Sequence, residues 1–163
     1  MMNLDTLSSI SSLPLQESQY LLALAAAAAL GALLGLERTI AGKHAGMRTY
    51  ALVSLGSCLF VILGTLSSVE LSFFSGINPL QLAGSIIIGI GFIGSGLVAF
   101  KNEHAELTTA SGIWVAAGMG MACGFGFYLL AFFSTILALA IFSLLLRFEN
   151  FIRRQYDGQQ EKN

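Results

Sequence analysis

The stretch GALLGLERTIAGKHAGMRTYALVSLG, residues 31–56, decides how this chain folds. An apolar run rich in small residues ends abruptly at Glu37 and Arg38, a short polar link follows, and a second apolar run begins at Tyr50. This pattern is typical of two membrane-spanning helices joined by a tight loop. Charged side chains are costly at membrane depth, so those that occur there usually have a partner or a function.

The composition of the whole chain also indicates a membrane protein. Of its 163 residues, 55% are hydrophobic and only 10% are charged, and the mean hydropathy is +0.77. Soluble domains usually carry about 25% charged residues. Cys58 and Cys123 both lie inside apolar runs, which favours a packing role over a disulfide or a metal site.

Apolar runs of similar length recur along the chain and predict five helices. Their approximate bounds are residues 20–36, 50–68, 80–100, 109–124 and 126–147. Each run is near the roughly 17–25 residues that span a bilayer, and a helix satisfies its own backbone polar groups in lipid. The predicted fold class is therefore all-α, a polytopic membrane protein with five transmembrane helices. The run at 109–124 is short and rich in glycine, which lowers its helix propensity.

The domain organisation follows from these runs. Residues 19–148 form the predicted five-helix membrane domain. Residues 1–18 are rich in serine and read as a polar or interfacial leader, and residues 149–163 form a short tail.

The basic residues indicate the orientation of the five predicted helices. Threading the chain through a bilayer five times places all 8 of them on one side: Arg38, Lys43, Arg48, Lys101, Arg147, Arg153, Arg154 and Lys162. The other side holds Asp5, Glu17 and Glu70. Basic residues concentrate on the cytoplasmic side of membrane proteins. We therefore expect the N-terminus outside and the C-terminus in the cytoplasm.

Small residues recur with helical spacing in three of the predicted helices. The stripes are Ala27–Gly31–Gly35, then Gly84–Gly91–Ser95 and Ser85–Gly89–Gly96, and finally Thr108–Gly112–Ala116–Gly120–Gly124. Small side chains let membrane helices approach closely. Two interpretations stay open for each stripe, a specific dimer face or ordinary packing within one bundle.

A glycine motif in the third predicted helix has two interpretations. Residues 89–94, GIGFIG, match the dinucleotide-binding pattern GxGxxG, but neither a preceding strand nor a later acidic residue supports that function. Glycines for helix packing explain the motif better. A locally unwound helix whose carbonyls bind a cation such as Mg²⁺ is the alternative.

Glu37 and Arg48 form the sharpest candidate pair. Glu37 is predicted at the negative end of one helix dipole and Arg48 at the positive end of the next, so each charge is unfavourable where it stands. Pairing would relieve both, and the intervening link is short enough to allow it. Arg38 suits its own helix end, so we expect its removal to affect stability less. The alternative is that all three charges only mark the membrane boundary.

Catalytic motifs are not visible in the sequence. It contains neither HExxH nor GxSxG nor a phosphate-binding loop, so we do not expect an enzyme. His44 has neither a second His nor a Cys near it in sequence, which favours a solvated loop position. Glu103 and Glu106 precede Thr108 and Thr109, as acidic residues do before a helix N-cap.

Four segments in order resemble the MgtC/SapB family of bacterial inner-membrane proteins. They are LLGLERTIAGKHAGMRTYALVSLG (33–56), NP (78–79), GIGFIGSGLV (89–98) and LTTASGIWVAAGMGMACGFGFY (107–128). The resemblance implies a five-helix membrane domain in the bacterial inner (cytoplasmic) membrane. It also implies that ten positions are important for function: Glu37, Arg38, Gly46, Arg48, Gly91, Gly94, Gly96, Thr108, Thr109 and Ala110.

This chain departs from the family pattern in two ways that bear on its function. Asn78-Pro79 followed by Gln81 stands where the family commonly has Asp-Pro and then Arg, and Ser85 replaces a usual Gln. These changes remove an acidic and basic pair from the entrance of the third helix. Many family members also carry a cytoplasmic C-terminal domain, and only the short tail follows Arg147 here.

The resemblance implies a regulator that contacts other membrane proteins, linked to magnesium limitation and virulence-associated stress. An oligomeric Mg²⁺ transporter or channel is the alternative. We expect a homo-oligomer in the lipid bilayer, with a dimer as the simplest form, and a membrane-protein partner. Gly31 and Gly35, Gly89, Gly91, Gly94 and Gly96, and Thr108 and Thr109 are the candidates for helix packing or a cation path.

Overall fold

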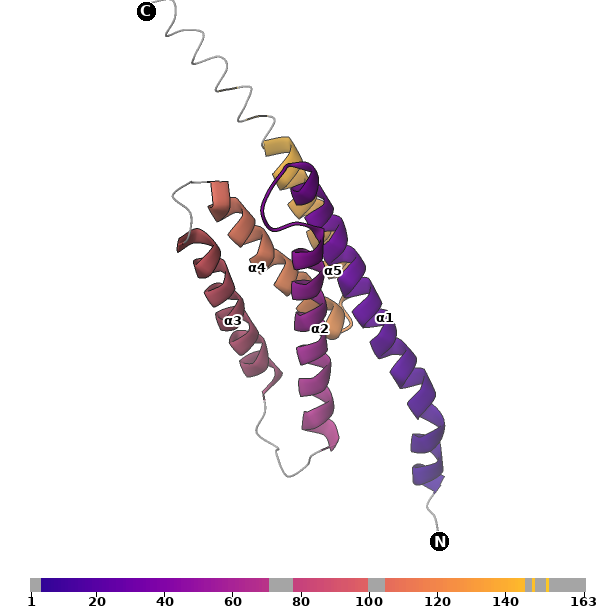
Figure 1. The fold of residues 1–163 in the computed structure, drawn as a ribbon. Helices are drawn as coiled ribbons and strands as arrows, with labels where there is room; N and C mark the ends of the chain where they lie inside the picture. The colour runs from indigo at the N-terminus through magenta and orange to yellow at the C-terminus, as the bar shows by residue number, and fades with distance from the viewer. Residues whose placement is uncertain (1–3, 71–77, 100–104, 146–147, 149–151, 153–163) are drawn as a thin grey trace, which may run out of the picture.

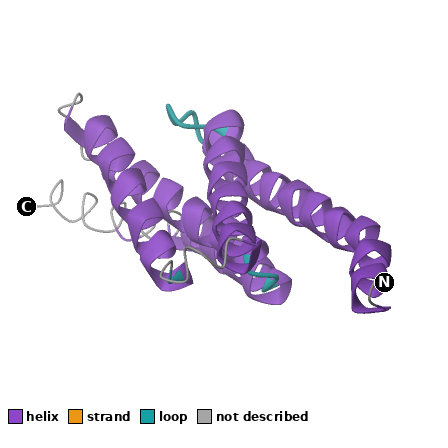
Figure 2. Cartoon of the chain, turned by 90° about the horizontal axis from the view of Figure 1, so that it is seen from below, coloured by secondary structure: helices purple, strands orange, loops and turns teal. Residues whose placement is uncertain are grey.

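The computed structural model describes residues 4–70, 78–99 and 105–145, together with 148 and 152. Its elements are α1 (Leu4–Ile40), α2 (Met47–Glu70), α3 (Pro79–Ala99), α4 (Ala105–Gly124), α5 (Tyr128–Ala140) and the short π-helix η2 (Ile141–Leu145). The predicted all-α class is confirmed, since these residues form helices and short loops without any strand (Figure 2). The predictions for Lys101, Arg147, Arg153, Arg154 and Lys162 fall outside the described residues.

Each predicted helix has a counterpart, with differences at the boundaries. α1 continues towards the N-terminus as far as Leu4, so most of the predicted leader belongs to the same helix. α4 begins at Ala105, one turn before the predicted start, which places Thr109 inside the helix and not at its N-cap. The last predicted helix is divided into α5 and η2.

Four of the described helical segments are long and apolar enough to cross a membrane. These spans are Glu17–Ile40, Met47–Ser67, Leu80–Val98 and Tyr128–Leu145. α4 does not belong to this set, because its threonines, Ser111 and glycines lower its hydropathy. Its position explains how this composition is tolerated: α4 contacts α1, α2, α3 and α5. The other helices cover much of a surface that would otherwise face lipid.

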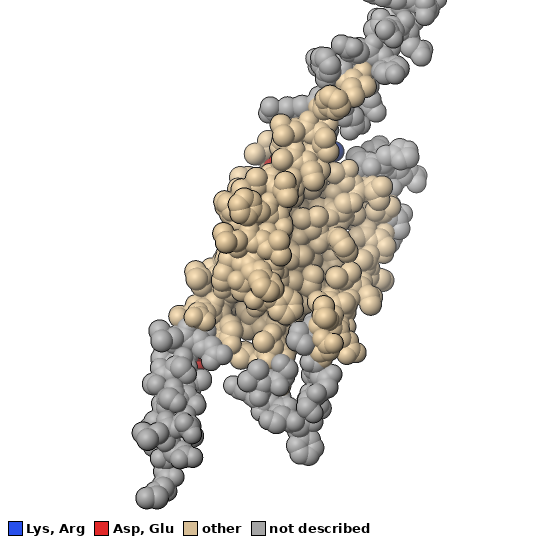
Figure 3. All heavy atoms as spheres, turned by 180° about the vertical axis from the view of Figure 1, so that it is seen from behind, with Lys and Arg blue, Asp and Glu red and all other residues tan. Residues whose placement is uncertain are grey.

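Successive helices run in alternating directions (Figure 1). The α1–α2 loop, the end of α3, the start of α4 and η2 lie at one end of the molecule, and the start of α1 lies at the other. The middle of the face in Figure 3 shows neither basic nor acidic side chains over its described surface. Such an uncharged band is what a bilayer requires of the surface it contacts.

Two sharp turns use glycine in the left-handed conformation. Gly42 has φ 68° and Gly126 has φ 81°. At the end of α1 the amide of Lys43 donates to the carbonyl of Arg38 at 2.9 Å, and the amide of Gly42 donates to that of Thr39 at 3.1 Å. This is the Schellman arrangement, in which glycine follows the helix end because a Cβ would be strained there.

The small-residue stripes of α1 and α4 pack inside the bundle. A Cβ added to Gly35 would lie 2.7 Å from Cα of Met47, and one added to Gly31 would lie 2.6 Å from the carbonyl oxygen of Tyr50. On α4, an added Cβ at Gly124 would lie 2.9 Å from the carbonyl oxygen of Cys58. Intrachain packing, the second of the two interpretations, therefore accounts for the stripes on α1 and α4.

Candidate functional site

Arg38 forms the centre of a charged cluster at the end of α1. The residue is only 2% exposed, and its Nε donates a hydrogen bond to Oε2 of Glu37 at 2.5 Å. Its guanidinium carbon lies 3.8 Å from the centroid of the Phe142 ring in η2. The cation thus has a carboxylate partner and an aromatic face, the two kinds of contact that stabilise a desolvated guanidinium.

The predicted pairing of Glu37 with Arg48 is wrong. The Glu37 carboxylate forms its ion pair with the adjacent Arg38, and the Arg48 side chain is exposed at the start of α2. Helix dipoles alone did not indicate this pair, because Arg38 suits its own helix end and therefore did not need a partner there. Glu37 is paired with the adjacent residue, and the Arg38 guanidinium stacks on the ring of Phe142 in η2, which follows α5.

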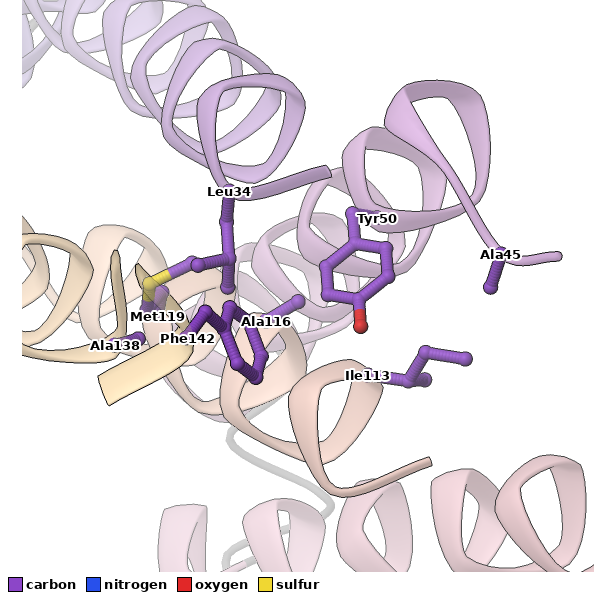
Figure 4. Close-up of a cluster of buried hydrophobic side chains, with 8 residues drawn as sticks. All are labelled: Leu34, Ala45, Tyr50, Ile113, Ala116, Met119, Ala138 and Phe142. Carbon is purple, nitrogen blue, oxygen red and sulfur yellow. The ribbon is translucent and has the colours of Figure 1, made fainter. Parts of the chain in front are cut away.

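Tyr50 connects this region to α4. Its side chain is fully buried, and its hydroxyl donates a hydrogen bond to the backbone carbonyl of Thr109 at 3.0 Å. Figure 4 shows the Tyr50 ring beside Ile113 in a buried cluster that also contains Phe142. Gly112 makes this packing possible, since a Cβ there would lie 2.7 Å from the Phe142 ring and closer still to the Tyr50 hydroxyl.

The α1–α2 loop is held by Thr39. Its hydroxyl donates to the carbonyl of Gly35 at 3.0 Å and accepts from the amide of Met47 at 3.0 Å. A Cβ at Gly46 would collide with the same hydroxyl oxygen. The loop therefore carries Gly46, and the two helices are fixed side by side next to the Arg38 cluster.

Beside the charged cluster, a cavity of about 370 Å³ opens between α1 and the end of the last helix. Its walls are apolar, and Glu37 and Ser143 supply its polar side chains. η2 contributes to both features, because Phe142 covers Arg38 while Ser143 faces this cavity. π-helical turns inside longer helices often occur at functional sites, where they redirect neighbouring side chains.

The candidate residues of α3 and of the start of α4 do not join this cluster. α3 is helical through residues 89–94, so the proposed unwound segment with free carbonyls is not present. No described atom lies within 4 Å of a Cβ added to Gly89, Gly91 or Gly96, whereas one added to Gly94 would lie 3.7 Å from Cβ of Ala110. Thr108 is exposed and Thr109 is buried.

Metal-binding side chains are not assembled among the described residues. Among the described residues, His, Cys, Asp and Glu side chains do not gather in groups of three or more that could hold a metal ion. A Mg²⁺ ion usually needs one or two carboxylates and keeps several waters. Glu37 is the carboxylate of the cluster, and its Oε2 is already occupied by Arg38.

Two residues of this site, Tyr50 and Phe142, were not identified from the sequence. Tyr50 and Phe142 are 92 positions apart by their residue numbers, and neither stands in a recognisable motif. The available signal was indirect: Gly112 lies on the small stripe of α4, and a glycine in such a stripe implies something bulky opposite. The identity of that bulky group depends on which helices are neighbours.

The chain resembles one family and several curated proteins. The sequence profile of the MgtC family matches residues 24–151. The putative magnesium transporter YhiD of Escherichia coli (strain K12) is 38% identical over 119 residues, which are 71% of this chain and 55% of YhiD. Protein MgtC of Salmonella typhimurium (strain LT2) is 37% identical over 129 residues, 78% of this chain and 52% of that protein.

A third relative is an uncharacterized protein of Haemophilus influenzae, 32% identical over 138 residues, 82% of this chain and 58% of that protein. The chain thus spans a little more than half the length of the curated relatives it matches. No solved structure matches it.

Proposed function

This chain belongs to the MgtC family and is a multi-pass protein of the bacterial inner membrane, and we propose that it is a regulator that acts through contacts with other proteins in that membrane. The regulation would help the cell adapt to magnesium limitation and to related stress, including stress associated with virulence. The names of its relatives support the link to magnesium, since YhiD is called a putative magnesium transporter.

The exposed face of α3 carries this proposal. Only 6% of the apolar window of α3 is buried, compared with 28% in α1 and 33% in α2. Gly84 and Gly91 lie on the face opposite Ile86 and Ile93, at 100° per residue, and no described atom lies within 4 Å of a Cβ added to either glycine. Glycines of membrane helices usually mark a close helix contact, and the described residues of the chain provide none at this face.

Self-association through this face is part of the proposal. A second copy and a different membrane protein would use the same chemistry, because both present an apolar helix to the small residues of α3. Five crossings, with the N-terminus outside and the C-terminus in the cytoplasm, are proposed as the topology. The alternating helix directions in Figure 1 support an odd number of crossings, with α4 as the fifth.

Mg²⁺ transport is the second candidate function. The printed name of YhiD favours it, and the carboxylate of Glu37 faces a cavity at the edge of the span. Transport would require several copies to enclose a path, because four or five helices of this length rarely do so alone.

Two measurements on the full-length protein separate these functions. Purified protein in liposomes containing a Mg²⁺-sensitive dye should give no more Mg²⁺ entry than protein-free liposomes. In a strain lacking the chromosomal copy, wild-type protein should restore growth at limiting magnesium, whereas Gly91→Leu should not. Gly118→Leu is the matched control, because no described atom lies within 4 Å of a Cβ at Gly118 either.

Protein-dependent Mg²⁺ entry into liposomes would contradict the regulatory function and establish transport. Full growth of Gly91→Leu cells, at membrane levels equal to wild type, would show that the α3 face is not the contact surface.

A further inference from the structure

Arg48 has no partner within the described part of the chain. The Glu37 carboxylate, which the helix dipoles had assigned to it, is bound to Arg38. Among the described residues the Arg48 side chain forms neither an ion pair nor a hydrogen bond, and it is exposed at the start of α2. It also stands at the positive end of the α2 dipole, where a cation by itself is unfavourable. The described chain thus contains a cation for which it supplies no anion.

The position of Arg48 on α2 directs its side chain towards lipid headgroups. The span Met47–Ser67 begins one residue before it, so Arg48 lies at the edge of the membrane. At about 100° per residue, Arg48 is on the face opposite the fully buried Tyr50 and near the face of Leu52, which is 66% exposed. Arg48 is therefore on the outer surface of the bundle, where a long basic side chain reaches the phosphate groups of the bilayer.

Lys43 supplies a second cation on the same loop. Residues 41–46 join α1 to α2 at one end of the molecule (Figure 1). The amide of Lys43 donates to the carbonyl of Arg38 at 2.9 Å, and the amide of Met47 donates to the Thr39 hydroxyl at 3.0 Å. Both ends of the loop are therefore fixed to α1. The Lys43 side chain, like that of Arg48, forms neither an ion pair nor a hydrogen bond with the described residues.

We propose that Lys43 and Arg48 bind the phosphate of an anionic phospholipid such as phosphatidylglycerol. A guanidinium places two parallel N–H donors on two phosphate oxygens, and an ammonium adds a compact positive charge. The phosphate also offsets the positive end of the α2 dipole, which disfavours Arg48 alone. Basic residues at a membrane surface attract anionic lipids in this way. This inference is independent of the regulatory function.

The surroundings of the two cations favour an anionic lipid over other sources of phosphate. Ile40 ends one span and Met47 begins the next, and their side chains are 80% and 44% exposed. These apolar side chains lie at the level of the acyl chains, so a lipid contacts them while a free phosphate does not. A zwitterionic headgroup also brings an ammonium, which the second cation of the loop repels.

Native mass spectrometry of the full-length protein in mild detergent tests the proposal. The protein is mixed with phosphatidylglycerol or with phosphatidylethanolamine of identical acyl chains, and wild type should bind phosphatidylglycerol more tightly. Arg48→Gln should weaken phosphatidylglycerol binding roughly fivefold, the loss expected for one basic residue at an anionic lipid. Lys162→Gln is the control, because it removes the same charge near the end of the chain.

Three outcomes would overturn the proposal. The first is equal phosphatidylglycerol binding by wild type and Arg48→Gln. The second is an equal loss in Lys162→Gln, which would show that net charge alone attracts the lipid. The third is displacement of the bound lipid by excess inorganic phosphate, which would assign the site to a free anion.

A footprinting measurement on wild-type protein requires no substitution. Acetic anhydride is added to the protein in the presence of either lipid, and the acetylation rates of Lys43 and Lys162 are compared by mass spectrometry of peptides. Phosphatidylglycerol should slow the acetylation of Lys43 relative to Lys162, because the bound phosphate covers the Lys43 ammonium. The same relative rates with both lipids would show that Lys43 does not hold the phosphate and would overturn the proposal.

Discussion

The guanidinium carbon of Arg38 lies 3.8 Å from the centroid of the Phe142 ring, which ties the end of α1 to the π-helix at the end of α5. A cation over an aromatic face gains about 2 kcal/mol or more when both groups are desolvated. Arg38 is buried, and it also forms a salt bridge with Glu37. The contact thus joins the first and last helices of the bundle at the edge of the membrane.

The two arginines of the opening stretch should differ strongly in their effect on stability. Arg38→Gln leaves Glu37 without its partner, at a cost of up to about 3–5 kcal/mol for a fully buried pair. The cost here should be smaller, because the Glu37 side chain is 19% exposed. Arg48→Gln should change stability little, because Arg48 is exposed. Thermal unfolding of both variants in the same detergent and lipid measures the difference. An Arg48→Gln variant as unstable as Arg38→Gln would contradict the structure.

A double-mutant cycle should assign the partner of Glu37. Glu37→Gln and Arg38→Gln together should cost less than the sum of the single changes, since the second change removes a charge that the first left unpaired. Glu37→Gln and Arg48→Gln should be additive within about 0.5 kcal/mol. The free energy of unfolding in native-like membranes is the quantity to compare. Coupling of Glu37 to Arg48, and not to Arg38, would restore the pairing first expected from the helix dipoles.

Phe142→Leu should lower stability by about 1–3 kcal/mol, because it removes both the aromatic face over Arg38 and part of a buried side chain. The loss should shrink in an Arg38→Gln background, where no cation remains to stack. Phe92→Leu is the control, since Phe92 is 81% exposed on α3. Equal losses from Phe142→Leu with and without Arg38 would show that the ring only fills space.

Gly35→Leu and Gly31→Leu should prevent α1 from packing against α2. The added atoms would meet backbone and not a flexible side chain, so the helices must separate. We expect a loss of folded protein, measured by gel filtration and by the midpoint of thermal unfolding. Gly118→Leu should be tolerated, because a side chain there enters open space. Normal folding of Gly35→Leu would mean that α1 and α2 are not in close contact.

The proposed topology predicts which side of the membrane each loop faces. In a background lacking Cys58 and Cys123, Glu70→Cys should react with a membrane-impermeant maleimide in intact cells. Lys43→Cys should react only after the cells are broken, because it lies on the side that carries the basic residues. A reporter fused after Asn163 should be active in the cytoplasm. Labelling of Lys43→Cys from outside would reverse the orientation.

The presence of α1 to α5 in the described part of the chain, and the approximate bounds of α2 and α3, were already determined by the sequence. Apolar runs of spanning length can satisfy their backbone only as helices in lipid, so runs such as 50–68 and 80–100 led directly to α2 and α3. Glycine spacing also showed that α1 and α4 approach other helices closely. The four quoted segments pointed to the family, which the match over residues 24–151 confirms.

Only the tertiary structure decided which groups meet. Glu37, Arg38 and Arg48 all stand near helix ends, and the helix dipoles are unfavourable for Glu37 and Arg48 but favourable for Arg38, so the dipoles alone indicated the wrong partner for Glu37. The Arg38 guanidinium also stacks on Phe142, which is far away in sequence and reaches Arg38 through the packing of the last helix. The same limit applies to glycine stripes. Spacing shows that a face is small, but only the arrangement of the helices leaves Gly91 bare while Gly35 lies against α2.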